Sequence, residues 1–175
     1  MATNFMDFSK KHVIAESSLL KATITGRIVN LVLEDADIDN GKLVVKGEYL
    51  RPEVYAAVKP TETDKVYLTL QVPLIYEEYT PACQSEYNFF NAKGDVIRCY
   101  PLEQDDIFTV SENGIKALGD VPVKGNLVVA NGFDITEVAA DTDVANVGFA
   151  GRIIEKVARS GGNFYQIEVI KNEKM

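Results

Sequence analysis

Apolar and polar residues alternate along much of the chain with a period of two. In residues 66–72, every second position carries Val or Leu, and Tyr, Thr and Gln occupy the positions between them. This alternation is typical of a β-strand that buries one face. Similar patterns predict further strands within residues 22–32, 42–46, 95–100, 107–110, 126–130, 152–157 and 164–170.

Turn-forming dipeptides separate these segments. Asn and Gly tolerate the positive φ that tight hairpin turns require. Many short strands with such frequent turns predict an all-β fold, a compact antiparallel barrel or sandwich with little helix. The dipeptides are Asn40-Gly41, Lys93-Gly94, Asn113-Gly114, Asn131-Gly132 and Gly161-Gly162.

Residues 151–172 carry a clear hairpin pattern. Two alternating segments flank residues 160–163, where consecutive glycines suit a tight turn. In the second segment, Tyr165, Ile167 and Val169 fall on one face of the strand. We expect that face to be buried.

Helix signals are few, and the chain divides simply. Residues 52–58 could begin a short helix at Pro52, which Pro60 would end. We expect residues 1–18 to form an N-terminal arm, because their apolar residues are scattered without a sustained period. A β-domain would then occupy residues 19–175, with a candidate subdomain seam at 112–124, where Asn, Gly and Pro accumulate.

Charge and hydropathy exclude several classes of protein. The 175 residues include 18 Lys and Arg against 26 Asp and Glu, a net charge of −8. Because Lys and Arg provide most of the affinity for nucleic acid, this balance argues against such a partner. No apolar run approaches the ~20 residues that span a bilayer, and the N-terminus lacks the apolar core of a secretory signal. We therefore expect no membrane partner and synthesis in a cytoplasm, with Cys83 and Cys99 as free thiols.

Residues 35–46 begin like an EF-hand calcium loop, with Asp at alternate positions. Asn40 then stands where that loop needs Gly, and Lys46 stands where it needs a bidentate Glu.

His12 is the only histidine, so His-rich metal sites are excluded and Ser-His or Cys-His catalysis would depend on a base in the arm. Adjacent acids such as Glu77 and Glu78 point to opposite faces of a strand. We expect a non-enzymatic protein with no cofactor and no metal site.

Aromatic residues between positions 76 and 100 are the main candidate for a binding surface. Acidic neighbours oppose nucleic acid as the ligand. Packing within the core and a protein–protein interface are the leading interpretations, and ligand binding is the third. The candidate interface residues in this cluster are Tyr76, Tyr79, Phe89 and Phe90.

The arm is the second candidate. Phe5, Met6 and Phe8 have little reason to be apolar in a solvated tail, and Lys10 and Lys11 could meet an acidic partner surface. Segments of this kind commonly order only on binding. The competing interpretation is that these residues pack on the protein's own core.

Short segments spread over most of the chain follow one another in a recognisable order. They are residues 38–43, 47–49, 54–57, 64–68, 75–79, 89–91 with Gly94 and Arg98, 106–111, 148–156 and 165–172. In this order the chain resembles small virion structural proteins of tailed phages and prophages of Gram-positive bacteria. That group includes head decoration and cement proteins.

The resemblance implies a structural component of the virion that decorates or cements the outer surface of the capsid. The expected partner is the lattice of the major capsid protein, and a second copy of the chain is a further candidate. The protein would occupy the host cytoplasm during assembly. A tail-tube or head–tail connector subunit is the alternative, with residues 73–91 as a loop for ring-to-ring contacts. A small ligand-binding or enzymatic barrel is the third interpretation.

Overall fold

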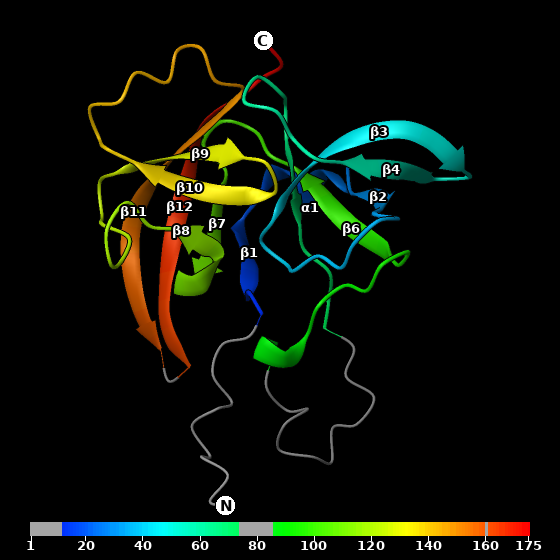
Figure 1. Cartoon of the computed structure of the whole chain (residues 1–175), viewed down its shortest axis with the longest axis horizontal. Helices are drawn as coiled ribbons and strands as arrows, with labels where there is room; N and C mark the ends of the chain where they lie inside the picture. Colours follow the sequence, from blue (N-terminus) through cyan, green and yellow to red (C-terminus); the bar gives the residue numbers. More distant parts are fainter. Residues whose placement is uncertain (1–11, 74–85, 160) are drawn as a thin grey trace, which may run out of the picture.

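A closed barrel and an open sheet build the fold (Figure 1). The computed structural model describes residues 12–73, 86–159 and 161–175. The all-β fold class is confirmed. Within these residues, only short helical segments interrupt the strands: α1 (Lys21–Thr25), η2 (Glu86–Asn88) and η3 (Glu112–Gly114). The barrel strands, in spatial order, are β2 (Val29–Val32), β4 (Val54–Val58), β3 (Leu43–Arg51), β5 (Tyr67–Thr69) and β6 (Val96–Pro101).

The second sheet has seven strands and holds the C-terminal half of the chain. Most neighbours run antiparallel, but β8 and β10 are parallel. In spatial order the strands are β1 (Ala15–Leu19), β7 (Ile107–Ser111), β12 (Gly162–Asn172), β11 (Phe149–Arg159), β9 (Leu127–Asn131), β10 (Asp134–Val138) and β8 (Ile115–Lys116).

The predicted C-terminal hairpin is confirmed, but its turn is shorter than the expected residues 160–163, because Gly162 and Asn163 already pair with β11. Strands β11 and β12 pair antiparallel from Phe149↔Asn172 to Arg159↔Gly162. Tyr165, Ile167 and Val169 are all buried, as the alternation predicts. Because β12 also pairs with β7, it is an interior strand of the sheet.

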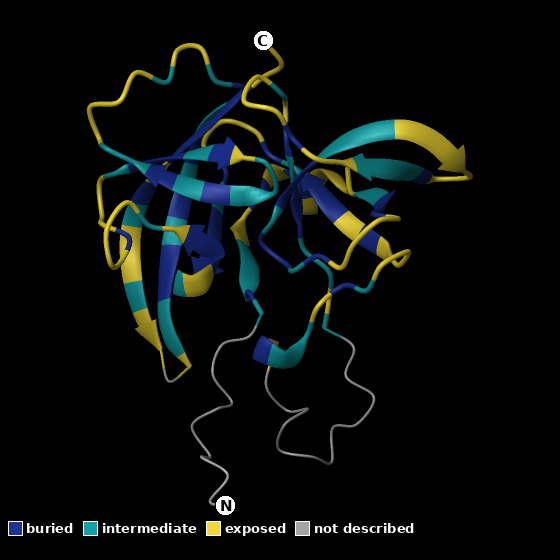
Figure 2. Ribbon diagram, in the orientation of Figure 1, coloured by how far each residue is buried: buried dark blue, intermediate teal, exposed yellow. Residues whose placement is uncertain are grey.

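Two apolar clusters form the core, which appears in dark blue in Figure 2. The larger one joins the two sheets, since Leu43 and Leu68 of the barrel pack with Phe108 and Ile167 of the open sheet. The smaller one fills the barrel with its own side chains, as is usual for small barrels. Its buried members are Leu31, Leu33, Ile38, Val44, Ile97 and Cys99.

Three local predictions need correction. The strand expected within residues 22–32 covers only β2 (Val29–Val32), because residues 21–25 form α1. Residues 15–18, expected in the arm, belong to β1 of the open sheet, which pairs along the otherwise free edge of β7, and Val13 before them is buried in the shared core. Residues 52–58 are no helix. Pro52 and Glu53 form the tight turn between β3 and β4, with Glu53 at φ 62°, and the following Val-Tyr-Ala-Ala-Val run continues as strand β4.

The change from barrel to open sheet lies away from the candidate seam at 112–124. It falls between β6 and β7, at residues 102–106. Residues 112–124 instead cross from β7 to strands on the far side of the same sheet.

Asn40 and Gly41 form a turn but join no hairpin, because β2 pairs with β4 and β6 rather than with β3.

Candidate functional site

A buried carboxylate organises the loop at residues 117–125. Glu137 on β10 is only 2% exposed. Its two oxygens accept hydrogen bonds from the backbone N–H of Leu118 at 2.8 Å, the backbone N–H of Val123 at 2.7 Å and the side-chain amide of Asn126 at 2.8 Å. Such charge-assisted bonds are among the stronger ones in proteins, so both ends of the loop are tied to the sheet.

The same loop presents apolar side chains to solvent. Leu118 is 64% exposed, Val121 43% and Val123 53%. Pro122 between them is buried. Apolar side chains that gather on a fixed loop commonly mark a protein–protein contact. We refer to residues 117–125 as the docking loop.

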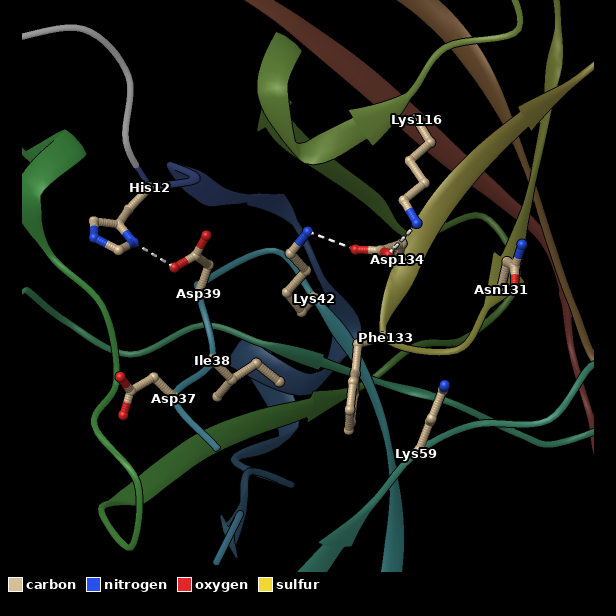
Figure 3. A pocket seen from close by; sticks show the side chains of 10 residues that line it. All are labelled: His12, Asp37, Ile38, Asp39, Lys42, Lys59, Lys116, Asn131, Phe133 and Asp134. Carbon is tan, nitrogen blue, oxygen red and sulfur yellow. Dashed lines mark hydrogen bonds and ion pairs between the residues drawn. The ribbon is translucent and has the colours of Figure 1, made fainter. Parts of the chain in front are cut away.

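A cleft of about 550 Å³ opens between the barrel and the open sheet (Figure 3). Its walls come from the connection between β2 and β3, the end of β4, strand β8 and the β9–β10 hairpin. It is lined by His12, Asp37, Ile38, Asp39, Lys42, Lys59, Lys116, Asn131, Phe133 and Asp134.

Asp134 lies between two lysines in this cleft. Lys42 Nζ is 2.7 Å from one carboxylate oxygen, and Lys116 Nζ is 2.6 Å from the other. Burial pulls the pKa of the Asp134 carboxyl upward, but the hydrogen bonds and charges of Lys116 and Lys42 outweigh it, so the pKa is lowered. The carboxylate therefore joins the barrel at Lys42 to the open sheet at Lys116.

His12 forms the opposite end of the cleft. Its Nδ1 lies 2.7 Å from Asp39 Oδ1, and its ring stacks on Phe90 with 4.9 Å between centroids. Asp37 accepts a hydrogen bond from the backbone N–H of Lys93 at 2.8 Å. The acidic segment that resembles part of a calcium loop is thus engaged with protein groups.

Most of the predicted interface residues fall outside the described part of the chain. Of the aromatic cluster, Phe89 is half-buried and Phe90 is 39% exposed against His12. Tyr76, Tyr79, Phe5, Met6, Phe8, Lys10 and Lys11 lie outside the described residues, as does Cys83. Cys99 is a buried free thiol, and burial raises its pKa far above the ordinary value, which makes it a poor nucleophile.

The sequence patterns predicted neither the docking loop as a binding surface nor the cleft. The accumulation of Gly and Pro at 112–124 marks a loop, yet the loop's anchor, Glu137, lies on a later strand. The cleft lysines come from elements that only the tertiary fold brings together. The anchoring role of Glu137 could have been inferred from the alternation of its strand. That alternation puts Glu137 on the buried face, where a charged side chain needs a hydrogen-bond partner.

The described residues contain neither a membrane-spanning helix nor a cluster of metal ligands. In residues 12–73, 86–159 and 161–175, no helix is long and apolar enough to cross a bilayer. Within the same part of the chain, no three His, Cys, Asp or Glu side chains are placed to hold a metal ion. No protein-family model, curated protein or solved structure matches the chain.

Proposed function

We propose that this protein is a non-enzymatic structural component of a phage particle that attaches to the outer surface of the head. The observation that carries the proposal is the docking loop, which exposes three apolar side chains and whose backbone a buried carboxylate holds at Leu118 and Val123. A preorganised apolar surface loses little conformational entropy on binding. The order of segments that resembles head decoration and cement proteins supports the same interpretation.

The N-terminal residues are proposed as a second contact with the capsid lattice. Because β1 belongs to the open sheet, the part that can act as a clamp without disturbing the fold is residues 1–11. It carries Phe5, Met6, Phe8, Lys10 and Lys11. Two weak contacts on one subunit bind a repeated lattice with combined strength, so neither needs high affinity alone.

Co-sedimentation with heads assembled without this protein tests the proposal. Replacing Leu118, Val121 and Val123 together by Ser should weaken retention on heads by at least about tenfold, because apolar anchors of an interface each contribute more than about 1 kcal/mol. The variant should keep the melting temperature of the parent, since the three side chains face solvent. Deleting residues 1–11 should weaken retention further.

A matched control is Ile24→Ser, which removes an apolar side chain that is 80% exposed on α1. It should leave retention unchanged. Equal retention of the parent and the triple-Ser variant would remove the docking loop from the interface. Failure of the intact protein to sediment with heads at all would reject the decoration proposal.

A tail-tube or connector subunit is the alternative proposal, and one feature favours it. The β3–β4 hairpin extends away from the rest of the molecule (Figure 1), and Tyr49 near its tip is 60% exposed. A projecting hairpin suits contacts between stacked rings. Electron microscopy of the concentrated protein distinguishes the two, because a tube subunit should form rings or tubes and a decoration protein should not.

A further inference from the structure

Three lysines from separate parts of the chain line the cleft beside the β9–β10 hairpin. Lys42 precedes β3, Lys59 follows β4, and Lys116 lies on β8. Figure 3 shows Lys42 and Lys116 directed at Asp134, with Lys59 extending beside Phe133. Three aspartates also line the cleft, but only Asp134 lies among these lysines, so positive charge exceeds negative charge at this end of the cleft.

The carboxylates that line the cleft already have partners. Asp134 uses one oxygen for Lys42 and the other for Lys116. Asp39 pairs with His12, and Asp37 accepts the backbone N–H of a residue outside the cleft lining. Both oxygens of Asp134 are therefore engaged by lysines at the hairpin end of the cleft, whereas Asp37 and Asp39, each with one oxygen in these contacts, lie at the His12 end.

Among the three cleft lysines, Lys59 is the one whose charge no described carboxylate compensates. Across the described ranges 12–73, 86–159 and 161–175, no carboxylate forms an ion pair with it. Its side chain crosses the hairpin turn at Gly132, where an added Cβ would lie 2.6 Å from Lys59 Cε. Gly132, at φ 61°, thus leaves the space that Lys59 occupies. Lys59 is exposed, and no group of the described residues accepts a hydrogen bond from its ammonium, whereas Lys116 uses one of its three N–H donors on Asp134.

We infer that this cleft binds a small organic oxyanion, a carboxylate or a phosphate, which Lys59 and Lys116 contact directly. The volume of about 550 Å³ is typical of sites for small organic molecules and exceeds what a bare phosphate would fill. Phe133 and Ile38 provide an apolar wall for the body of the ligand, and the Asn131 amide provides a further donor. This site is independent of the proposed attachment to phage heads.

NMR titration of the full ¹⁵N-labelled chain tests the inference with three probes of similar size: glucuronate, glucose 6-phosphate and glucose. Either anionic sugar should produce saturable shifts at the amides of Lys59, Lys116 and Gly132, and added salt should weaken its binding. The tighter of the two anions identifies the oxyanion as a carboxylate or a phosphate. Glucose should bind at least about tenfold more weakly than that anion, because it lacks the charge-assisted hydrogen bonds.

The variant Lys59→Gln should weaken binding of the preferred anion by at least about tenfold, and its spectrum away from the cleft should match the parent, since Lys59 holds no ion pair. Lys65→Gln is the matched control, because Lys65 is an exposed lysine outside the cleft lining. Equal affinities of these two variants would overturn the inference. So would glucose binding as tightly as the anions, or an absence of saturable shifts with all three probes.

Discussion

Glu137, Asp106 and Asn172 are polar side chains that the fold buries, and each supplies a hydrogen-bond partner for backbone groups. Glu137 accepts the N–H groups that close the docking loop. Asp106 accepts the N–H groups of Lys21 and Glu103, where the chain passes from barrel to open sheet. The Asn172 side chain pairs with both the N–H and the C=O of Val66. Because an unpaired buried polar group is costly, these contacts fix the geometry locally.

Asp134 makes stability dependent on pH. Its pKa is lowered in the folded protein, so its contribution is present above the unfolded pKa of roughly 3.9 and is lost as pH falls through the folded value. Asp134→Asn should therefore be less stable than the parent at pH 7. The difference in unfolding free energy, measured by urea denaturation, should shrink at pH 3.

Asp120→Asn is the control, because Asp120 is an exposed carboxylate of the docking loop. Its stability should follow that of the parent at both pH values. A difference between the parent and Asp134→Asn that stays constant from pH 7 to pH 3 would show that the carboxylate contributes through packing rather than charge.

At the scale of elements, the β11–β12 hairpin is central to the open sheet. Strand β12 is paired on both sides, and β11 continues the sheet to β9. Its buried face contributes Tyr165, Ile167 and Val169 to the core cluster that both sheets share. The hairpin therefore supports the sheet that carries the docking loop and one wall of the cleft.

Ile167→Ala should lower the unfolding free energy by about 2–5 kcal/mol, since it leaves a cavity in the shared core. Ile170→Ala on the same strand is the matched control, because Ile170 is only partly buried. It should cost clearly less. Urea denaturation monitored by far-UV circular dichroism gives both values, and equal losses for the two variants would contradict the observed register.

At the scale of the whole molecule, the barrel and the open sheet meet through backbone as well as side chains. The loop between β4 and β5 packs against the chain that enters β11, and Gly148 N–H donates to the Glu62 carbonyl at 2.7 Å. A Cβ at Gly148 would lie 2.3 Å from the carbonyl oxygen of Asp64. Close contact here therefore requires a residue without a side chain.

Gly148→Ala should separate these segments, because the atom it meets belongs to the backbone and cannot rotate away. Overpacking of this kind costs about 1–3 kcal/mol, which a thermal melt should record as a clear fall in Tm. Gly119→Ala is the control, since a Cβ there has open space around it. Its Tm should match that of the parent, and a matching Tm for Gly148→Ala would disprove the close packing at this contact.

Alternation and turn residues act between near neighbours, so they correctly predicted the all-β class and the buried face of β12. Alternation does not specify which strand pairs with which. The pairing of β2 with β4 and β6, and of residues 15–19 with β7, depends on contacts between parts of the chain that are far apart in the sequence. The docking loop and the cleft depend on such distant contacts. Glu137 anchors the loop because β8, β9 and β10 are neighbours at one edge of the open sheet. Lys59 and Lys116 line one cleft because the barrel and the open sheet pack around a shared core.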